Sequence, residues 1–275
     1  MLRNAIFMRN IFSSNLQKLS CSCLKQNGYR FLLTQQSESQ ALQNISEAST
    51  KKLNQIENVQ PTLTEEEVYR KSLSHLDFFG VADMFTVEDL FNANVHLGHK
   101  EGTLCNHMKP YIFGSRLGHL IIDLDQTATM LRDSLNFTAH VAFRGGIILF
   151  MSRGIQHQLL IEKTAEKCQE YSHTKPWHTG IFTNSTRTFG CVTRLPDLVI
   201  FLNTMYDVTS QHGAVKDAAK MFIATTGIVD TNCDPRLITY PVPGNDDTDS
   251  AVKLYCRLYK EAILRGKRKR KELID

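Results

Sequence analysis

The chain has 275 residues, of which 42% are hydrophobic, and its formal net charge is +4. This length is enough for a packed core in one domain with extensions or in two small domains. Its longest apolar runs fall far below the ~20 residues that cross a bilayer, so we predict no membrane-spanning segment. Residues 86–264 hold 17 basic and 18 acidic residues, which excludes a generic polycation.

The first 37 residues carry no carboxylate, because Glu38 is the first acidic residue of the chain. They also lack the apolar core of about 7–15 residues and the small-residue cleavage site of a secretory signal. We therefore predict a mitochondrial transit peptide over residues 1–37, with a disordered basic terminus as the alternative. The basic residues of this segment are Arg3, Arg9, Lys18, Lys25 and Arg30.

Residues 38–85 form a polar segment with a net charge of −4. A short helix is predicted over 63–76, after Pro61. Because the segment offers too few apolar residues for a core of its own, it is predicted to be a linker or docking arm.

From Thr86 onward the pattern alternates between helices and strands. Thr86 and Asp89 are close to a capping box, which marks the start of the first helix. Further helices are predicted from Asp125 to the glycines at 145 and 146, from Gly154 through Cys168, over 208–221 and over 249–264. Strands are predicted over 147–151, 198–202, 222–229 and 237–240. This alternation predicts an α/β fold, a parallel sheet with helices on both faces.

Five strand residues are predicted to form the centre of the core. They are Ile147, Leu149, Leu198, Ile200 and Val229.

The sequence shows no catalytic apparatus. Dinucleotide-binding, Walker, nucleophile-elbow and HExxH motifs are all absent from the 275 residues. The turn at 244–247 with Asp249 could hold Mg²⁺, although a turn followed by a helix cap is the preferred interpretation. We predict no enzyme activity and no cofactor.

Cysteine and histidine spacing also argues against a metal site. No CxxC pair occurs, so we expect reduced thiols rather than a disulfide framework or a zinc ribbon. The candidates His96, His99, His107 and Cys105 match no structural zinc spacing. They are predicted to be hydrogen-bonded core or loop residues.

Several separated motifs resemble one family. Residues 94–100 (NVHLGHK), 108–116 (MKPYIFGSR) and 119–124 (HLIIDL) look like the opening signature of the universal small-subunit ribosomal protein two family. Later motifs are similar too: Trp177 with Gly180 and Thr183–Asn184, then 195–200, 228–235 and 243–247. The resemblance spans residues 86–264 in order.

This resemblance implies a Rossmann-like, flavodoxin-type sheet and a structural role in the small ribosomal subunit. With the predicted transit peptide, it implies a mitochondrial matrix protein that binds ribosomal RNA and neighbouring ribosomal proteins, with no membrane partner and no homo-oligomer. Bacterial members carry a long helical hairpin where only Ser185–Arg194 stand here, so we predict that the hairpin is missing. The alternative is a mitochondrial nucleotide-binding enzyme on a flavodoxin-like sheet.

Cations in predicted loops and at the basic end, 265–275, are the expected RNA contacts, since phosphates attract Lys and Arg. Trp177 could stack on a base or fasten a loop to the core. Gly98 and Gly114 are expected to permit positive φ or close backbone approach. The predicted RNA-binding residues are Lys109, Arg116, Arg153, Lys175, Trp177, Arg187, Arg194, Lys267, Arg268, Lys269, Arg270 and Lys271.

Overall fold

The structure is a computed structural model that describes residues 65–273. The predicted transit peptide, 1–37, and the part 38–64 of the predicted polar segment 38–85 lie outside the described residues. The helices are α2 (Glu65–Ser74), α3 (Val87–Asn92), α4 (Leu124–Phe143), α5 (Gln158–Cys168), α6 (Ser185–Phe189), α7 (Gly213–Lys220) and α8 (Asp249–Leu273). The strands are β1 (Leu97–Lys100), β2 (Ile112–Arg116), β3 (His119–Ile122), β4 (Ile148–Met151), β5 (Tyr171–His173), β6 (Leu198–Phe201), β7 (Ala224–Val229) and β8 (Tyr240–Pro243).

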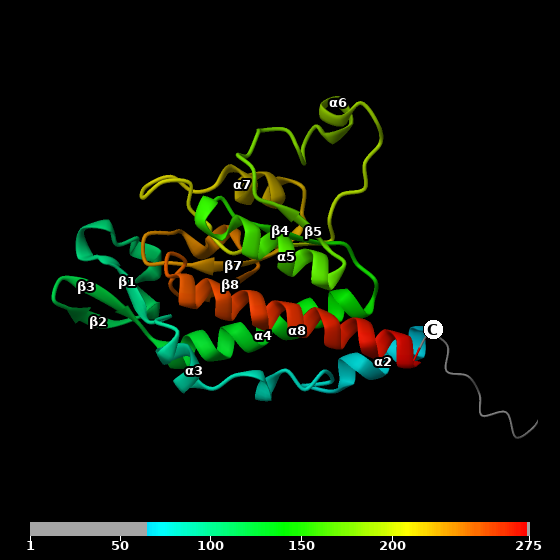
Figure 1. Ribbon diagram of the computed structural model, residues 1–275, viewed down its shortest axis with the longest axis horizontal. Helices are drawn as coiled ribbons and strands as arrows, with labels where there is room; N and C mark the ends of the chain where they lie inside the picture. The colour runs from blue at the N-terminus through cyan, green and yellow to red at the C-terminus, as the bar shows by residue number, and fades with distance from the viewer. Residues whose placement is uncertain (1–64, 274–275) are drawn as a thin grey trace, which may run out of the picture. The chain divides into compact units, whose positions relative to one another are not determined.

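The larger sheet has five parallel strands in the order β5-β4-β6-β7-β8. In this order the first strand of the sheet lies between the second and the third, which is the flavodoxin-like arrangement. Helices α4, α5 and α8 pack on one face, and α7 packs on the other (Figure 1). The predicted α/β, flavodoxin-type fold is confirmed.

The two faces of this sheet are filled by alternate residues of each strand. In β6, Leu198 and Ile200 point into the core beneath α4, α5 and α8, whereas Val199 and Phe201 point into the core beneath α7. All four are fully buried. A strand that is apolar at every position is therefore covered on both sides, as parallel sheets require.

Element ends differ from the prediction where local turns intervene. The helix predicted over 208–221 begins only at Gly213, and Val208 lies exposed in the preceding turn. Phe222, predicted in a strand, has a positive φ of 55° after α7 and is exposed, so the strand starts at Ala224. The strand predicted over 237–240 runs instead from Tyr240 to Pro243, because Pro235–Leu237 forms a 3-10 helix.

Caps explain where two helices begin. The Thr86 side chain accepts from the Asp89 N–H and the Asp89 carboxylate accepts from the Thr86 N–H, so the predicted capping box is confirmed. Asp123, not Asp125, caps α4 through a 3.1 Å bond from the Asp125 N–H.

The core prediction holds for three of its five residues. Leu198, Ile200 and Val229 are fully buried. Ile147 and Leu149 are half-buried, because they lie on the side of β4 where an apolar cavity remains open.

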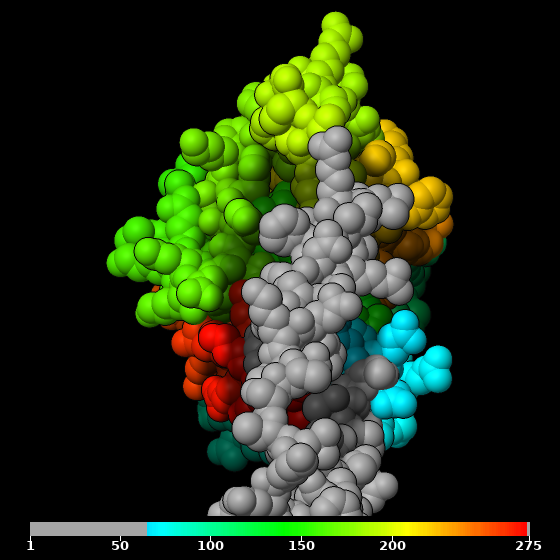
Figure 2. All heavy atoms as spheres, turned by 90° about the vertical axis from the view of Figure 1, so that its right-hand side faces the viewer, coloured from blue at the N-terminus to red at the C-terminus, as the bar shows by residue number. Residues whose placement is uncertain are grey.

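The basic end of the chain is helical. Residues 265–273 continue α8, which packs along the full length of α4 (Figure 1). A Cβ on Gly266 would lie 2.4 Å from the Ala139 carbonyl oxygen, so only glycine lets the two helices approach this closely. In both views the segment around α6 projects far from the red end of α8 (Figures 1 and 2).

Part of the predicted polar segment packs into the same core. Val68 of α2 and the loop residues Phe79, Val81 and Phe85 are buried against α4 and α8. These contacts explain how residues 65–85, although polar overall, belong to the packed unit.

A second sheet was not predicted. Its three antiparallel strands have the order β1-β3-β2. Leu117 and Gly118, with φ of 53° and 78°, form the two-residue turn between β2 and β3, as in a type I′ hairpin. In the described part of the chain, no helix has the length and apolar character to span a membrane.

We expect Ile200→Ala to lower the free energy of unfolding by about 2–5 kcal/mol, since it removes buried methylenes and leaves a cavity between two packed faces. Denaturant unfolding of the purified chain measures the change. Val192→Ala, at a residue 91% exposed, is the control and should change stability by less than about 0.5 kcal/mol. Equal effects of the two substitutions would contradict the central position of β6.

Candidate functional site

A row of basic side chains crosses the antiparallel sheet. His119 on the middle strand pairs with Lys100 of β1 on one side and with Arg116 of β2 on the other. Residues paired in this way project from the same face of a sheet. All three are exposed, and neither cation forms an ion pair with any residue between 65 and 273.

The sequence identified only one member of this row. Arg116 was predicted, whereas Lys100 and His119 were missed because their strands were not recognised. The sequence signal for these antiparallel strands is the Leu117–Gly118 pair. A two-residue turn with positive φ at both positions joins two antiparallel strands and pairs the residues on either side of it. Phe113 of β2 is 80% exposed on the same sheet, and an exposed aromatic ring can stack on a base.

The structure does not bring the predicted RNA-binding residues together. Lys109, Lys175 and Arg187 are exposed on separate segments. Arg153 lies 3.6 Å above the Tyr206 ring and pairs with Asp207. Arg194 is 3.1 Å from the Asp197 carboxylate in the same loop.

Three cations at the end of α8 are held by internal acceptors. Lys267 pairs with Glu170 and donates to the Cys168 carbonyl. Lys269 donates to the Phe78 carbonyl and lies over the Phe78 ring. Arg270 donates to the Phe143 carbonyl at 3.4 Å.

Arg268 and Lys271 of the same run are exposed.

Trp177 packs against the core beneath α7. Its ring packs against Phe182, and its indole N–H donates to the buried Asp217 carboxylate at 3.1 Å. This environment agrees with the interpretation that Trp177 fastens a loop to the core.

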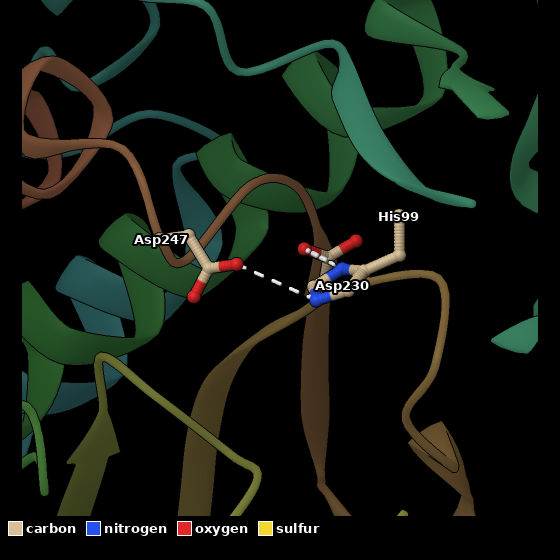
Figure 3. Close-up of side chains that lie close together, drawn as sticks. All are labelled: His99, Asp230 and Asp247. Carbon is tan, nitrogen blue, oxygen red and sulfur yellow. Dashed lines mark hydrogen bonds and ion pairs between the residues drawn. The ribbon is translucent and has the colours of Figure 1, made fainter. Parts of the chain in front are cut away.

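A histidine–carboxylate cluster lies where the two sheets meet. A Cβ on Gly98 would be 2.5 Å from the Thr231 side chain, so glycine permits β1 to cross the end of β7 closely. The ring of the next residue, His99, then lies between two carboxylates (Figure 3). Its Nδ1 is 2.9 Å from Asp230 Oδ2, and its Nε2 is 3.4 Å from Asp247 Oδ2. Gly114 shows neither expected feature, because its φ is not positive and open space surrounds it.

The cluster concentrates negative charge beside one imidazole. The hydrogen bond to Asp230, reinforced by the charges of Asp230, Asp247 and Asp246, raises the pKa of His99 to about 9. Burial, together with the neighbouring Asp230 and Asp247 charges, raises the pKa of Asp246 well above its ordinary value. The imidazolium form of His99 is therefore stabilised at neutral pH.

The turn that carries these carboxylates is a helix start, as preferred from the sequence. Asn245 Oδ1 accepts from the N–H groups of Asp247 and Thr248 at 2.9 and 3.3 Å, just before α8 begins. Asp249 pairs with Lys253 and lies 3.4 Å from His157. Among residues 65–273, the group that could hold a metal ion is His99, Asp230 and Asp247. It includes none of the other predicted candidates, His96, His107 and Cys105.

The carboxyl edge of the parallel sheet does not fit a nucleotide phosphate. A cavity of about 350 Å³ lies there, lined by Asp246 and Asp247 as well as Arg153. Two carboxylates repel a phosphate, and Arg153 is already paired with Asp207. The nucleotide-binding alternative therefore gains no support from this edge.

We expect acid to weaken the cap of α7. His212 Nδ1 accepts from the Ala214 N–H at 3.2 Å, which requires an unprotonated nitrogen. Burial, with the charges of His173 and Arg153, lowers the pKa of His212 to about 4. As the pH falls from about 6.5 to 4, the unfolded chain binds this proton first, so stability should fall by up to about 3 kcal/mol.

His212→Asn keeps a capping acceptor without a titrating ring, and it should flatten the pH dependence of urea unfolding in that window. The exposed His107→Asn is the control. Equal pH profiles for the His212 variant and the unsubstituted chain would contradict this role.

The residues that form both sheets also match known proteins in sequence. The family described as ribosomal protein S2 matches residues 90–198 and 188–266. Small ribosomal subunit protein uS2m of Bos taurus is 58% identical over 206 residues, covering 75% of this chain and 70% of the bovine one. Small ribosomal subunit protein uS2 of Rickettsia bellii (strain OSU 85-389) is 31% identical over 224 residues, covering 66% and 76%. On this match, the chain belongs to the ribosomal protein S2 family.

Proposed function

We propose that this chain is a structural constituent of the mitochondrial small ribosomal subunit and acts there without enzymatic activity. The observation that carries this function is the 58% identity to the bovine small ribosomal subunit protein uS2m. The matched residues, 90–266, include every strand of both described sheets. A protein of this kind associates with ribosomal RNA and with other ribosomal proteins.

Within that role, we infer that the antiparallel sheet is the main RNA contact. Lys100 and Arg116 are exposed, unpaired within the described residues, and placed on either side of His119. Lys109 precedes β2 and is exposed as well. Exposed cations on one sheet can meet consecutive phosphates, whereas cations held by carbonyls must first give up those bonds. Arg268, Lys271, Lys175 and Arg187 are proposed as additional separate contacts.

Protein neighbours are proposed for the segment around α6. Phe189 and Val192 are 55% and 91% exposed there, and apolar surface of this kind suits a protein partner better than phosphate. This is also the stretch in which the resemblance predicts the missing hairpin. The two family matches overlap at 188–198.

The test of the subunit assignment is sedimentation of a mitochondrial lysate. The protein should sediment with the small-subunit RNA and remain there after EDTA separates the subunits. A pool that stays at the top of the gradient and is stabilised by nucleotides would instead support the nucleotide-binding alternative.

We expect Lys100→Gln combined with Arg116→Gln to reduce the salt dependence of RNA binding by about two counterions, since each lost phosphate contact lowers the slope of log K against log salt by roughly one. Binding of the full chain to a small-subunit ribosomal RNA transcript is measured over a salt series. Arg236→Gln is the control, because Arg236 is exposed yet already pairs with Asp234 at 2.7 Å. An unchanged slope in the double variant would contradict the proposed contact.

For import, we propose that residues 1–37 direct the chain to mitochondria. Replacing Arg3, Arg9, Lys18, Lys25 and Arg30 with Gln removes the positive charge of the segment. Fluorescence microscopy of a tagged chain should then show it in the cytosol. The control is Lys51→Gln combined with Lys52→Gln, because these charges lie outside the predicted transit peptide. This control variant should still be imported. Normal import of the first variant would reject the transit peptide.

A further inference from the structure

The core beneath α7 stays open at one side of the parallel sheet. A cavity of about 630 Å³ lies there beside the outermost strand β5, and Ile147 and Leu149 line it. The loop between β5 and β6, which projects from the sheet and carries α6 (Figure 1), supplies Trp177, Phe182 and Phe189 to the same cavity. Protein interiors leave few voids larger than a water molecule. A cavity of this size and apolar character therefore indicates a surface that another molecule completes.

Two buried polar atoms in this cavity lack a partner. His173 Nδ1 and Thr193 Oγ1 form no hydrogen bond with any residue between 65 and 273. Burial lowers the pKa of His173, so its ring is uncharged at neutral pH. Buried polar atoms are normally hydrogen-bonded, and the N–H and C=O groups of a peptide can satisfy both a neutral imidazole and a hydroxyl. The matching occupant combines apolar side chains with neutral hydrogen-bonding groups.

The strand β5 offers an open edge to such an occupant. It is the last strand of its sheet, and among the described strands it pairs only with β4. An edge strand presents unpaired main-chain N–H and C=O groups, with which an extended peptide can pair as an added strand. Every second side chain of that peptide would point to the side of the sheet on which the cavity lies.

The charge around the cavity favours a protein over RNA. Among the described residues that line it, Arg194 is the only lysine or arginine, and its guanidinium lies 3.1 Å from the Asp197 carboxylate. The exposed Phe189 and Val192 extend the apolar surface beyond the cavity. An apolar surface whose one cation is already paired suits a protein segment better than a phosphate.

The residues of this chain that precede α2 do not show the pattern of such a segment. Their apolar residues Leu53, Ile56 and Val59 recur every third position, whereas a strand that fills one side needs apolar residues at every second position. Pairing with β5 of a second copy would add only the three residues Tyr171–His173, too few for a cavity of about 630 Å³. A different protein is the occupant that fits.

We propose that the cavity beside β5 binds an extended, alternately apolar segment of a neighbouring small-subunit ribosomal protein, which adds a strand to the β5 edge. This inference rests on the proposed function, because the neighbour is taken to be another protein of the small subunit. The segment covers Ile147 and Leu149, the two strand residues that remain half-buried in this chain. Its main chain supplies hydrogen bonds to His173 and Thr193.

Photocrosslinking in assembled small subunits identifies the segment. The full chain carries benzoylphenylalanine in place of Tyr171, an exposed residue of β5, and the linked peptides are sequenced by mass spectrometry. The expected product is one peptide of another small-subunit protein, with apolar residues at alternate positions. Benzoylphenylalanine in place of Phe222, which is exposed and does not line the cavity, is the control and should not link to this peptide.

A synthetic peptide of the linked sequence, with any tryptophan replaced by phenylalanine, is then titrated into the purified full chain. Trp177 is the only tryptophan of the chain and lines the cavity, so its fluorescence reports binding. Phe189→Ala should bind the peptide about tenfold more weakly, because it removes an aromatic contact from the interface. Phe222→Ala is the matched control and should bind with unchanged affinity. Both side chains are exposed, so both variants should fold, which circular dichroism checks.

Methylation of the peptide main chain tests the added strand. Only every second N–H of a strand faces its neighbour, so N-methylation of one alternate set of residues should abolish binding while methylation of the other set leaves it intact. Equal behaviour of the two methylated peptides would overturn the added strand.

Three further results would overturn the docking site. These are a Tyr171-position crosslink to RNA, to this chain itself or to a second copy of it, the absence of any protein crosslink at that position, and equal peptide affinity in Phe189→Ala and the unsubstituted chain. Each can occur while the protein still sediments with the small-subunit RNA. Failure of the docking site is therefore distinguishable from failure of the proposed function, which the sedimentation test addresses.

Discussion

Burial of β6 on both faces is the constraint on which the rest of the structure depends. Because Leu198 and Ile200 contact one core while Val199 and Phe201 contact the other, the strand can be stable only between two helical layers. Its neighbours β4 and β7 pair with it in parallel. The carboxyl ends of these strands consequently share one edge, and this edge meets the antiparallel sheet at His99 and Asp230.

The same packing explains how a nearly neutral body binds a polyanion. The long helix α8 lies against α4, and its last turns direct Lys267, Lys269 and Arg270 onto carbonyl groups and Glu170. Those cations offset helix and loop carbonyls rather than forming a free charged tail. Lys100 and Arg116 on the antiparallel sheet, by contrast, are exposed and form no ion pair within the described residues, so their charge is available to a phosphate.

Helices and strands that are set by local residue patterns could be predicted from the sequence. Elements and contacts that depend on pairing between distant residues could not. Apolar runs such as 198–202 identified the buried strands, and Thr86 with Asp89 identified a cap. The antiparallel strands mix glycine, polar and apolar residues, so their periodicity is weak. His99 and Asp230 are separated by 131 positions, and no local pattern relates them. The sequence predicts that the last helix ends at 264 and that the basic run at 267–271 contacts RNA. The helix instead continues to Leu273, because Gly266 fits closely against α4, a contact between residues far apart in the chain.

The antiparallel sheet, rather than the end of α8, is the proposed principal RNA contact. Ultraviolet crosslinking of intact mitochondrial small subunits, followed by mass spectrometry of the RNA-linked peptides, measures this directly. RNA crosslinks are expected within residues 100–119, with few in 265–273. Crosslinks concentrated in 265–273, with residues 100–119 free of RNA, would contradict it.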